Sequence, residues 1–311
     1  MLLSGARIVG EPPKRKLELL VVILSYNQGR FIKAAVDSVL IQNPIDGMKI
    51  LIHDDASVDG SGNTIQEIVQ ENPNQVFAIL QNQNRFSQGI NILVEIQNLY
   101  EPTFIARLDG DDFWISKDKL EKQITIMRSN PNIAVLAHSC FILDEVENKY
   151  SKCKMSRFGF LNPNLLAMCN FVSTATVMYR TDKVLPLPKE FIKYYIQDWP
   201  LWAIMTSRGK LYFLKDIYSV YRLHGKNGFG GRKNREFLSD TLGVNKMIAN
   251  SKEGKSKLIW TLMLWIRLLA SIFDYVTLGK TTLILNKICN AIVGIKLIQV
   301  DNFRSDTCEH D

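Results

Sequence analysis

The chain has 311 residues, of which 46% are hydrophobic, and this composition excludes a disordered protein and predicts a globular one with one large or two modest domains. The formal net charge is +7, and the stretch from Lys226 to Arg267 alone carries nine lysines and arginines against three acids. This local charge argues against a nucleic-acid groove across the whole molecule and favours a local anionic partner such as a phospholipid surface. A merely solvated basic face is the alternative.

The cysteines and the N-terminal arm indicate the compartment. The five cysteines form no CxxC pair and have no histidine at zinc-site spacing, so we expect reduced, structural thiols. The N-terminal arm, residues 1–16, is broken by Glu11, Pro12 and Pro13 and does not have the form of a secretory signal. A cytoplasmic location is therefore the expectation.

From residue 17 to residue 109, apolar runs alternate with segments of helical spacing. The first run, "LELLVVILSYN", is rich in β-branched residues and predicts a strand buried on both faces of a parallel sheet. Further strands are expected at 48–57, 75–84 and 103–109, and helices at 29–42, 64–72 and 89–100. Strands and helices joined by short links in this order predict an α/β fold with a doubly wound, mostly parallel sheet.

The second half predicts a helix at 117–130, a strand at 133–143, a helix at 197–209 and strand segments from 210 into a glycine-rich loop. We expect a nucleotide-binding half at 17–130, an acceptor half at 131–230, and a C-terminal region at 231–311 that is basic and then helical and amphipathic.

The apolar run 258–279 is about long enough to cross a bilayer, but Arg267, Ser271 and Asp274 would form a costly polar stripe there. We therefore expect residues 232–299 to lie on a membrane surface, with packing on the protein or on another subunit as the alternative.

Polar clusters follow three of the predicted strands, and ligands of such sheets bind beyond the carboxyl ends of the strands. The clusters are Ser25-Tyr26-Asn27, Asp54-Asp55 and Asp109-Asp111-Asp112. In Asp-Gly-Asp, two carboxylates flank a residue without a side chain, so that Mg²⁺ or Mn²⁺ and a diphosphate can approach closely. Capping of the next helix explains one acid and not three. A phosphatase of the haloacid dehalogenase type would carry such a motif on its first strand, whereas here it follows a later one.

The ordered set of motifs resembles family 2 glycosyltransferases of the GT-A fold over roughly residues 17–227. The matching stretches are "VVILSYNQGRFIKAAVDSVLIQ", "LIHDDASVDGS", "FIARLDGDDFW" followed by "KLEKQ", "IQDWPLWAIMTSRG" and "YRLHGKN". Each stretch alone is weakly specific, and their order and spacing together are strongly so. The resemblance implies that Tyr26, beside Ser25 and Asn27, packs against the donor base, and that Asp55, with Asp54 beside it, accepts a hydrogen bond from uracil.

The resemblance also implies roles for the later acids. Asp109 would lie near the donor ribose and the metal, Asp111 would be the principal metal ligand, and Asp112 would orient the site. His224 matches a third metal ligand or a phosphate contact, and Asp198 matches the catalytic base. The structural alternatives are an Asx turn for "DDASVDG", a helix N-cap for Asp198 and a purely structural His224. Gln197 departs from the family pattern, which commonly has an acid before the base.

The function implied is an inverting, metal-dependent transfer of sugar from a UDP-sugar to a hydroxyl of a glycan or lipid-linked glycan, in cell-surface polysaccharide biosynthesis. Mn²⁺ or Mg²⁺ would stabilise the leaving diphosphate, and the enzyme would act as a peripheral protein at the inner face of the membrane. The sequence favours no nucleic-acid partner and leaves oligomerisation open. The alternative is a non-catalytic GT-A-like module that binds nucleotide or tethers partners at a membrane.

Overall fold

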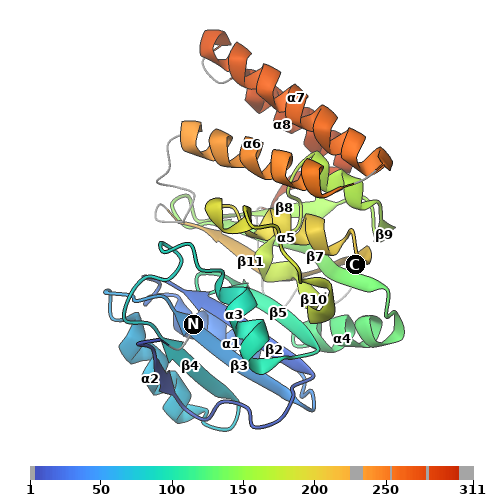
Figure 1. Cartoon of the computed structure of the whole chain (residues 1–311). Coiled ribbons are helices and arrows are strands. Elements are labelled where there is room, and N and C mark those ends of the chain that lie inside the picture. Colours follow the sequence, from blue (N-terminus) through green and yellow to red (C-terminus); the bar gives the residue numbers. More distant parts are fainter. Residues whose placement is uncertain (1–3, 225–233, 253, 278–279, 301–311) are drawn as a thin grey trace.

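Four parallel strands form the first half of the sheet in the computed structural model of the chain (Figure 1). The structure describes residues 4–224, 234–252, 254–277 and 280–300. The predictions that fall on Lys226, Arg232 and Lys233, and on the side chains of Ser271 and Asp274, lie outside the described residues. The parallel strands are β2 (Leu19–Ser25), β3 (Met48–Asp54), β4 (Val76–Leu80) and β5 (Phe104–Asp109), and the short β1 (Arg7–Val9) pairs with β4 in the antiparallel direction.

The second half of the chain extends the same sheet with mixed strand directions. Its strands are β6 (Phe113–Trp114), β7 (Ile133–Asp144), β8 (Lys149–Met155), β9 (Gly159–Leu161), β10 (Met178–Arg180), β11 (Lys210–Leu223) and β12 (Ile295–Val300). The strand order is β1-β4-β3-β2-β5-β10-β7-β11-β6, and β8, β9 and β12 pair to the side of this path. β10 is antiparallel to both β5 and β7, so it joins the two predicted halves into one hydrogen-bonded sheet.

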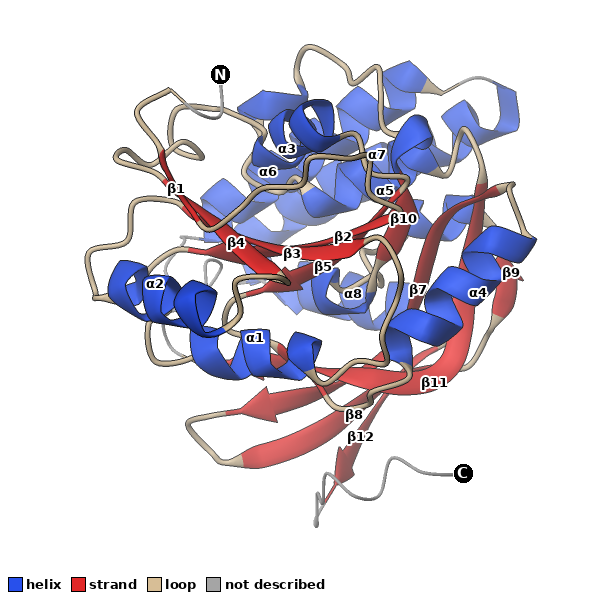
Figure 2. Cartoon of the chain, turned by 90° about the horizontal axis from the view of Figure 1, so that it is seen from below, coloured by secondary structure: helices blue, strands red, loops and turns tan. Residues whose placement is uncertain are grey.

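Helices cover both faces of the sheet (Figure 2). They are α1 (Ile32–Leu40), α2 (Ser61–Glu71), α3 (Ile92–Tyr100), α4 (Lys119–Ser129), α5 (Asp198–Met205), α6 (Asn234–Ser251), α7 (Gly254–Thr277) and α8 (Lys280–Val293). Short 3-10 turns span Pro163–Ala167, Thr174–Thr176, Thr181–Lys183 and Phe191–Lys193. The predicted α/β class, with helices on both faces of a mostly parallel sheet, is confirmed.

The core has two layers because successive residues of a strand point to opposite faces. In β2, Leu20 and Val22 belong to the core under α3, α5 and the C-terminal helices, whereas Leu19, Val21 and Ile23 belong to the core under α1, α2 and α4. The strand is therefore buried on both faces, as its unbroken apolar sequence predicts.

The chain turns directly from α5 into β11 at Gly209. A Cβ atom at this position would lie 2.8 Å from the carbonyl oxygen of Asn132 and 2.8 Å from the Cβ of Ala134. Only glycine permits this close approach. Helix α5 itself ends at Met205, earlier than the predicted end at residue 209.

The C-terminal region packs on the protein as α6, α7 and α8, which form the outer layers at the top of Figure 1. In the part of the chain that the structure describes, no helix is both long and apolar enough to cross a membrane. The predicted helical C-terminal region contains three helices and, at its end, one strand. Gly294, at φ 92°, ends α8 in the left-handed conformation, and the residues after it form β12, which pairs with β8.

Candidate active site

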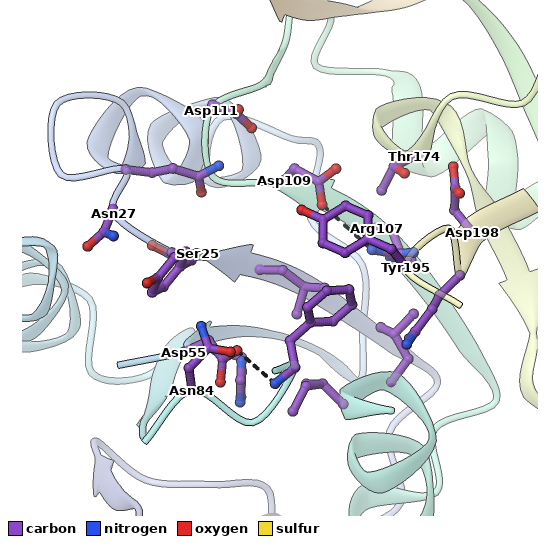
Figure 3. Close-up of a pocket in the computed structure, with 18 of the residues that line it drawn as sticks. Ser25, Asn27, Asp55, Asn84, Arg107, Asp109, Asp111, Thr174, Tyr195 and Asp198 are labelled. Atoms are coloured by element: carbon purple, nitrogen blue, oxygen red, sulfur yellow. Dashed lines mark hydrogen bonds and ion pairs between the residues drawn. The ribbon is translucent and has the colours of Figure 1, made fainter. Parts of the chain in front are cut away.

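A cavity of about 480 Å³ lies beyond the carboxyl ends of β2, β3 and β5. Register explains why polar residues meet there, since Ser25 pairs with Asp54 across β2 and β3, and Leu24 pairs with Asp109 across β2 and β5. The predicted site residues that line the cavity are Ser25, Tyr26, Asn27, Asp55, Asp109, Asp111, Asp198 and His224. In Figure 3, Ser25, Asp55 and Asn84 lie on one side of the cavity, and Thr174 and Asp198 lie on the opposite side.

The end of β2 forms one wall of the cavity. Asn27 adopts a left-handed conformation, at φ 55°, and its side chain accepts a hydrogen bond from the backbone N–H of Val58 at 2.9 Å. Its own backbone N–H donates to Oγ of Ser57 at 2.8 Å. Asn27 therefore ties the end of β2 to the turn after β3, while the half-exposed Tyr26 beside it offers an aromatic surface at the cavity.

The two adjacent acids after β3 have different roles. Asp54 accepts from the hydroxyl and the backbone N–H of Ser57, at 2.6 and 3.0 Å, and it is not among the residues that line the cavity. Asp54 therefore holds the turn after β3, and its predicted place among the donor contacts stays a prediction. Asp55 lines the cavity and accepts from the backbone N–H groups of Arg85 and Phe86, at 2.7 and 3.0 Å.

Asp55 thus fixes the loop after β4 and keeps acceptor capacity for a ligand, because each carboxylate oxygen can accept more than one hydrogen bond. Burial raises its pKa, and the two backbone N–H groups oppose the shift.

Asp109, at the end of β5, lies near the middle of the cavity with Arg107 beside it (Figure 3). Nη2 of Arg107 is 3.6 Å from Oδ1 of Asp109. Burial raises the pKa of Asp109 to about 6; Arg107 lowers it, and the charges of Asp111 and Asp198 add to the rise. A bound cation would favour the charged form of this carboxylate.

Asp111 and His224 come together from positions 113 residues apart, with Oδ2 of Asp111 2.9 Å from Nε2 of His224. Adjacent ligands of an octahedral ion at about 2.1 Å are separated by about 3 Å, so the pair fits two neighbouring positions on one Mg²⁺ or Mn²⁺ ion. Among the described residues, no group of three or more histidine, cysteine or acidic side chains is gathered closely enough to hold a metal. Oxygen atoms of a bound diphosphate would have to supply further ligands, as Mg²⁺ sites commonly require.

Asp112 is not among the residues that line the cavity, and it links two parts of the chain. It is almost fully buried, and its Oδ1 accepts from the backbone N–H of Arg222 at 2.8 Å. Nε of Arg222 in turn donates to the backbone carbonyl of Asp111 at 2.8 Å. Burial, with the charges of Asp111 and Asp109, holds the pKa of Asp112 well above its usual range. Asp112 therefore fixes the end of β11, and with it His224, relative to the acidic loop.

Asp198 begins α5 on the side of the cavity opposite Asp55 (Figure 3). Its Oδ2 accepts a hydrogen bond from Nδ2 of Asn170 at 2.9 Å. Oδ1 of Asn170 accepts from the backbone N–H of Val172 at 3.3 Å, so the amide is held from both ends. The expected alternative, an N-cap role for Asp198, does not describe this residue, because it is the first residue of the helix and Gln197 precedes it as the N-cap without a side-chain bond.

Several cavity residues escaped the sequence analysis. Arg107 could have been found, because it lies two residues before Asp109 on the same strand and so shares its face. Phe86 and Tyr195 meet edge to face with ring centroids 5.0 Å apart, and both line the cavity. Nothing in the sequence connects two aromatic residues in separate loops, so neither they nor Asn170 could have been placed.

The fold and the cavity together define a class of protein: an α/β protein whose strand ends present acids and an aromatic residue to one cavity. The family model described as glycosyl transferase family 2 matches residues 20–184. The chain belongs to this family.

The chain is also similar to individual proteins and to solved structures. An uncharacterised protein of Mycobacterium tuberculosis is 27% identical over 206 residues, which is 66% of this chain and 58% of that protein. The chain is also 27% identical over 208 residues to the Escherichia coli UDP-Glc:alpha-D-GlcNAc-diphosphoundecaprenol beta-1,3-glucosyltransferase WfgD, covering 65% of this chain and 76% of that one. The structure of S. aureus TarS residues 1–349 in complex with UDP-GlcNAc superposes with a TM-score of 0.60 at 15% identity, covering 81% and 72% of the two chains.

Proposed function

We propose that the protein is a metal-dependent, inverting glycosyltransferase that moves a sugar from a UDP-sugar to a hydroxyl of a glycan or lipid-linked glycan. The observation that carries the proposal is one cavity lined by Asp55, by the Asp111–His224 pair and by Asp198. Such a cavity offers a base contact, a cation contact and a proton acceptor. The assignment to a family of glycosyltransferases supports the reaction class.

The donor end of the proposal rests on Tyr26 and Asp55. The ring of Tyr26 would pack on the base, and an oxygen of Asp55 would accept a hydrogen bond from the N–H of uracil. A buried acceptor that faces this N–H would discriminate against bases without it by about 1–3 kcal/mol. The WfgD relative acts with UDP-Glc, and TarS was solved with UDP-GlcNAc, which supports a uridine nucleotide as the donor class.

Asp111 and His224, with Asp109 next to them, would hold Mn²⁺ or Mg²⁺ with the donor diphosphate. When bound, the cation would supply charge stabilisation to the leaving UDP. Asp198, held by Asn170, would take the proton from the acceptor hydroxyl. Attack of this hydroxyl on the anomeric carbon from the face opposite the leaving UDP would break the C–O bond to the diphosphate and invert the configuration in a single displacement.

For the acceptor, we infer a lipid-linked glycan in cell-surface polysaccharide biosynthesis, used by a peripheral protein at the inner face of the membrane. The printed name of the WfgD relative includes a diphosphoundecaprenol acceptor, which is a lipid-linked sugar. This similarity supports the acceptor class.

The test is a thermal melt with UDP, with and without MnCl₂, followed by UDP release from a panel of UDP-sugars. Wild type should gain a manganese-dependent shift in Tm and release UDP, whereas Asp198→Asn should keep the shift and lose at least about a hundredfold in turnover. A shift in both proteins without release of UDP from any donor, even with membrane extract as acceptor, would favour a non-catalytic nucleotide-binding module.

A further inference from the structure

Over the described side chains of helix α7, up to residue 270, there are two apolar faces, of which one packs on the protein and the other is exposed. The inner face buries Trp260 and Met263 in the main core, and Arg267 on this face donates a hydrogen bond to the carbonyl of Met168. The predicted polar position Arg267 therefore points toward the protein and not toward solvent.

The outer face of α7 is exposed along its described length. Leu258 is 68% exposed, Leu262 56%, Trp265 58% and Leu269 52%. These four residues recur at intervals of four, three and four, so they form one row along the helix. Single exposed leucines are ordinary on protein surfaces, but a continuous row that includes a tryptophan marks an interaction surface.

Helix α8, which packs beside α7, carries a second exposed row. Ile284, Ile288 and Ile292 are all exposed and lie at intervals of four residues. The buried side of the same helix is formed by Cys289 and Val293. The hairpin of α7 and α8 therefore repeats one arrangement twice, with an inner face that joins the core and an outer face of large apolar side chains.

Positive charge borders these rows. Lys255 and Lys257 are exposed at the start of α7, and Lys287 is exposed on α8. Among the described side chains of 254–270 and 283–300 there is no aspartate or glutamate. A second copy of the chain would bring these lysines face to face, whereas an anionic surface would neutralise them.

We propose that the outer rows of α7 and α8, with their bordering lysines, dock on an anionic lipid bilayer. The apolar side chains would enter the boundary between headgroups and acyl chains, and the lysines would bind the headgroups. This inference deepens the proposed use of a lipid-linked acceptor. Lipid binding is measured without donor or acceptor, so its failure and the failure of the proposed reaction can be told apart.

The inner face of α7 shows how docking would orient the cavity. The guanidinium of Arg267 lies 5.2 Å from the ring centre of Trp199, and the rings of Trp199 and Trp260 are 6.0 Å apart. Trp199 is the neighbour of Asp198 on α5. Helices α7 and α5 thus contact each other through these side chains. A bilayer bound to α7 would therefore hold α5, and with it Asp198, at a constant distance from the membrane surface.

The chain contains its own reporter of docking. It has five tryptophans, of which Trp114, Trp199, Trp202 and Trp260 are buried and Trp265 alone is exposed. Adding vesicles of 30% phosphatidylglycerol in phosphatidylcholine to the full chain should shift tryptophan emission to shorter wavelength and reduce iodide quenching. Trp265→Phe should abolish the spectral change and still float with the vesicles, because phenylalanine keeps the apolar contact.

Flotation of the full chain with vesicles tests whether this surface binds an anionic bilayer. Wild type should float with the anionic vesicles at low salt and not with pure phosphatidylcholine. The triple variant Leu262→Ser/Trp265→Ser/Leu269→Ser should bind the anionic vesicles at least about tenfold more weakly than wild type. The variant Lys255→Glu/Lys257→Glu should also bind more weakly than wild type, and its difference from wild type should grow as the salt concentration is lowered. Val146→Ser, an exposed apolar residue elsewhere on the surface, is the matched control and should bind as wild type does.

Two results would overturn the proposal. One is equal binding of wild type and the triple variant to anionic vesicles, with both showing a native circular dichroism spectrum. The other is the absence of vesicle binding together with a concentration-dependent dimer in light scattering that the triple variant abolishes, which would assign the surface to a second copy of the chain.

Discussion

The side-chain amide of Asn170 lies 2.9 Å from Oδ2 of Asp198 and is itself held by the backbone N–H of Val172. The proposed base therefore has one oxygen occupied by a donor and the other available to a substrate hydroxyl. Asn170 acts through Asp198, which makes it a positioning residue.

Asn170→Ala is expected to lower kcat by about tenfold with little change in the KM for the donor, since it removes a hydrogen bond to a charged group. Asn170→Asp is expected to move the acid limb of the kcat pH profile to higher pH, because two neighbouring carboxylates resist joint ionisation. A merely structural role would leave the pH profile in place. Asn74→Ala, at an exposed position outside the cavity, is the control.

Removing the Asp111 carboxylate should remove the response to metal. Asp111→Ala is expected to lose the manganese-dependent part of the UDP shift in Tm, and His224→Gln to weaken it, because each removes one donor of the pair 2.9 Å apart. Asp37→Ala removes an exposed carboxylate that pairs with Lys33 on the surface, and it should behave as wild type. A full manganese response in Asp111→Ala would refute the ligand role.

The neighbouring acids after β3 offer a paired comparison. Asp55→Asn should weaken UDP binding by about tenfold in calorimetry, because the amide replaces an acceptor at the cavity and disturbs the bonds to Arg85 and Phe86. Asp54→Asn should leave UDP affinity within about twofold, because Asp54 bonds to Ser57 in a turn. Equal losses in the two variants would contradict the separation of their roles.

His53 should make stability depend on pH. Burial lowers its pKa from 6.5 to about 4, so between these values the unfolded chain binds a proton that the folded protein does not. The contribution of the neutral, buried His53 to the free energy of unfolding is therefore complete above pH 6.5 and is lost as the pH falls toward 4. The free energy of unfolding should therefore drop by about 2 kcal/mol more in wild type than in His53→Gln between pH 7 and pH 5. Urea titrations of both proteins at the two pH values measure this difference, and parallel changes would contradict it.

Much of the first half of the fold could be predicted from sequence. β2 reads as a continuous apolar run because it is buried on both faces, and the polar clusters at Ser25, Asp55 and Asp109 follow strands whose carboxyl ends meet at one edge. These features could be predicted because a buried strand is recognised from the apolar pattern of its own residues, without knowledge of its distant contacts.

The second half carried less readable information. β10 is only three residues long, and it enters the sheet between β5 and β7 because of pairing with strands far away in sequence. A short strand is determined by its partners more than by its own residues. The same holds for β12, which exists by pairing with β8 at an edge of the sheet.

By itself the sequence determined the α/β class, the acids at the strand ends and the basic, apolar character of the C-terminal region. Only the tertiary structure decided that Asp111 meets His224, that Asp54 turns away while Asp55 faces the cavity, and that Asn170 reaches Asp198. It also decided which side of α7 is covered, because a helix with apolar residues on both faces carries no pattern that distinguishes them. All of these are contacts between residues that are distant along the chain. Local sequence patterns do not determine such contacts, because the distance between the two side chains depends on how the strands and helices pack.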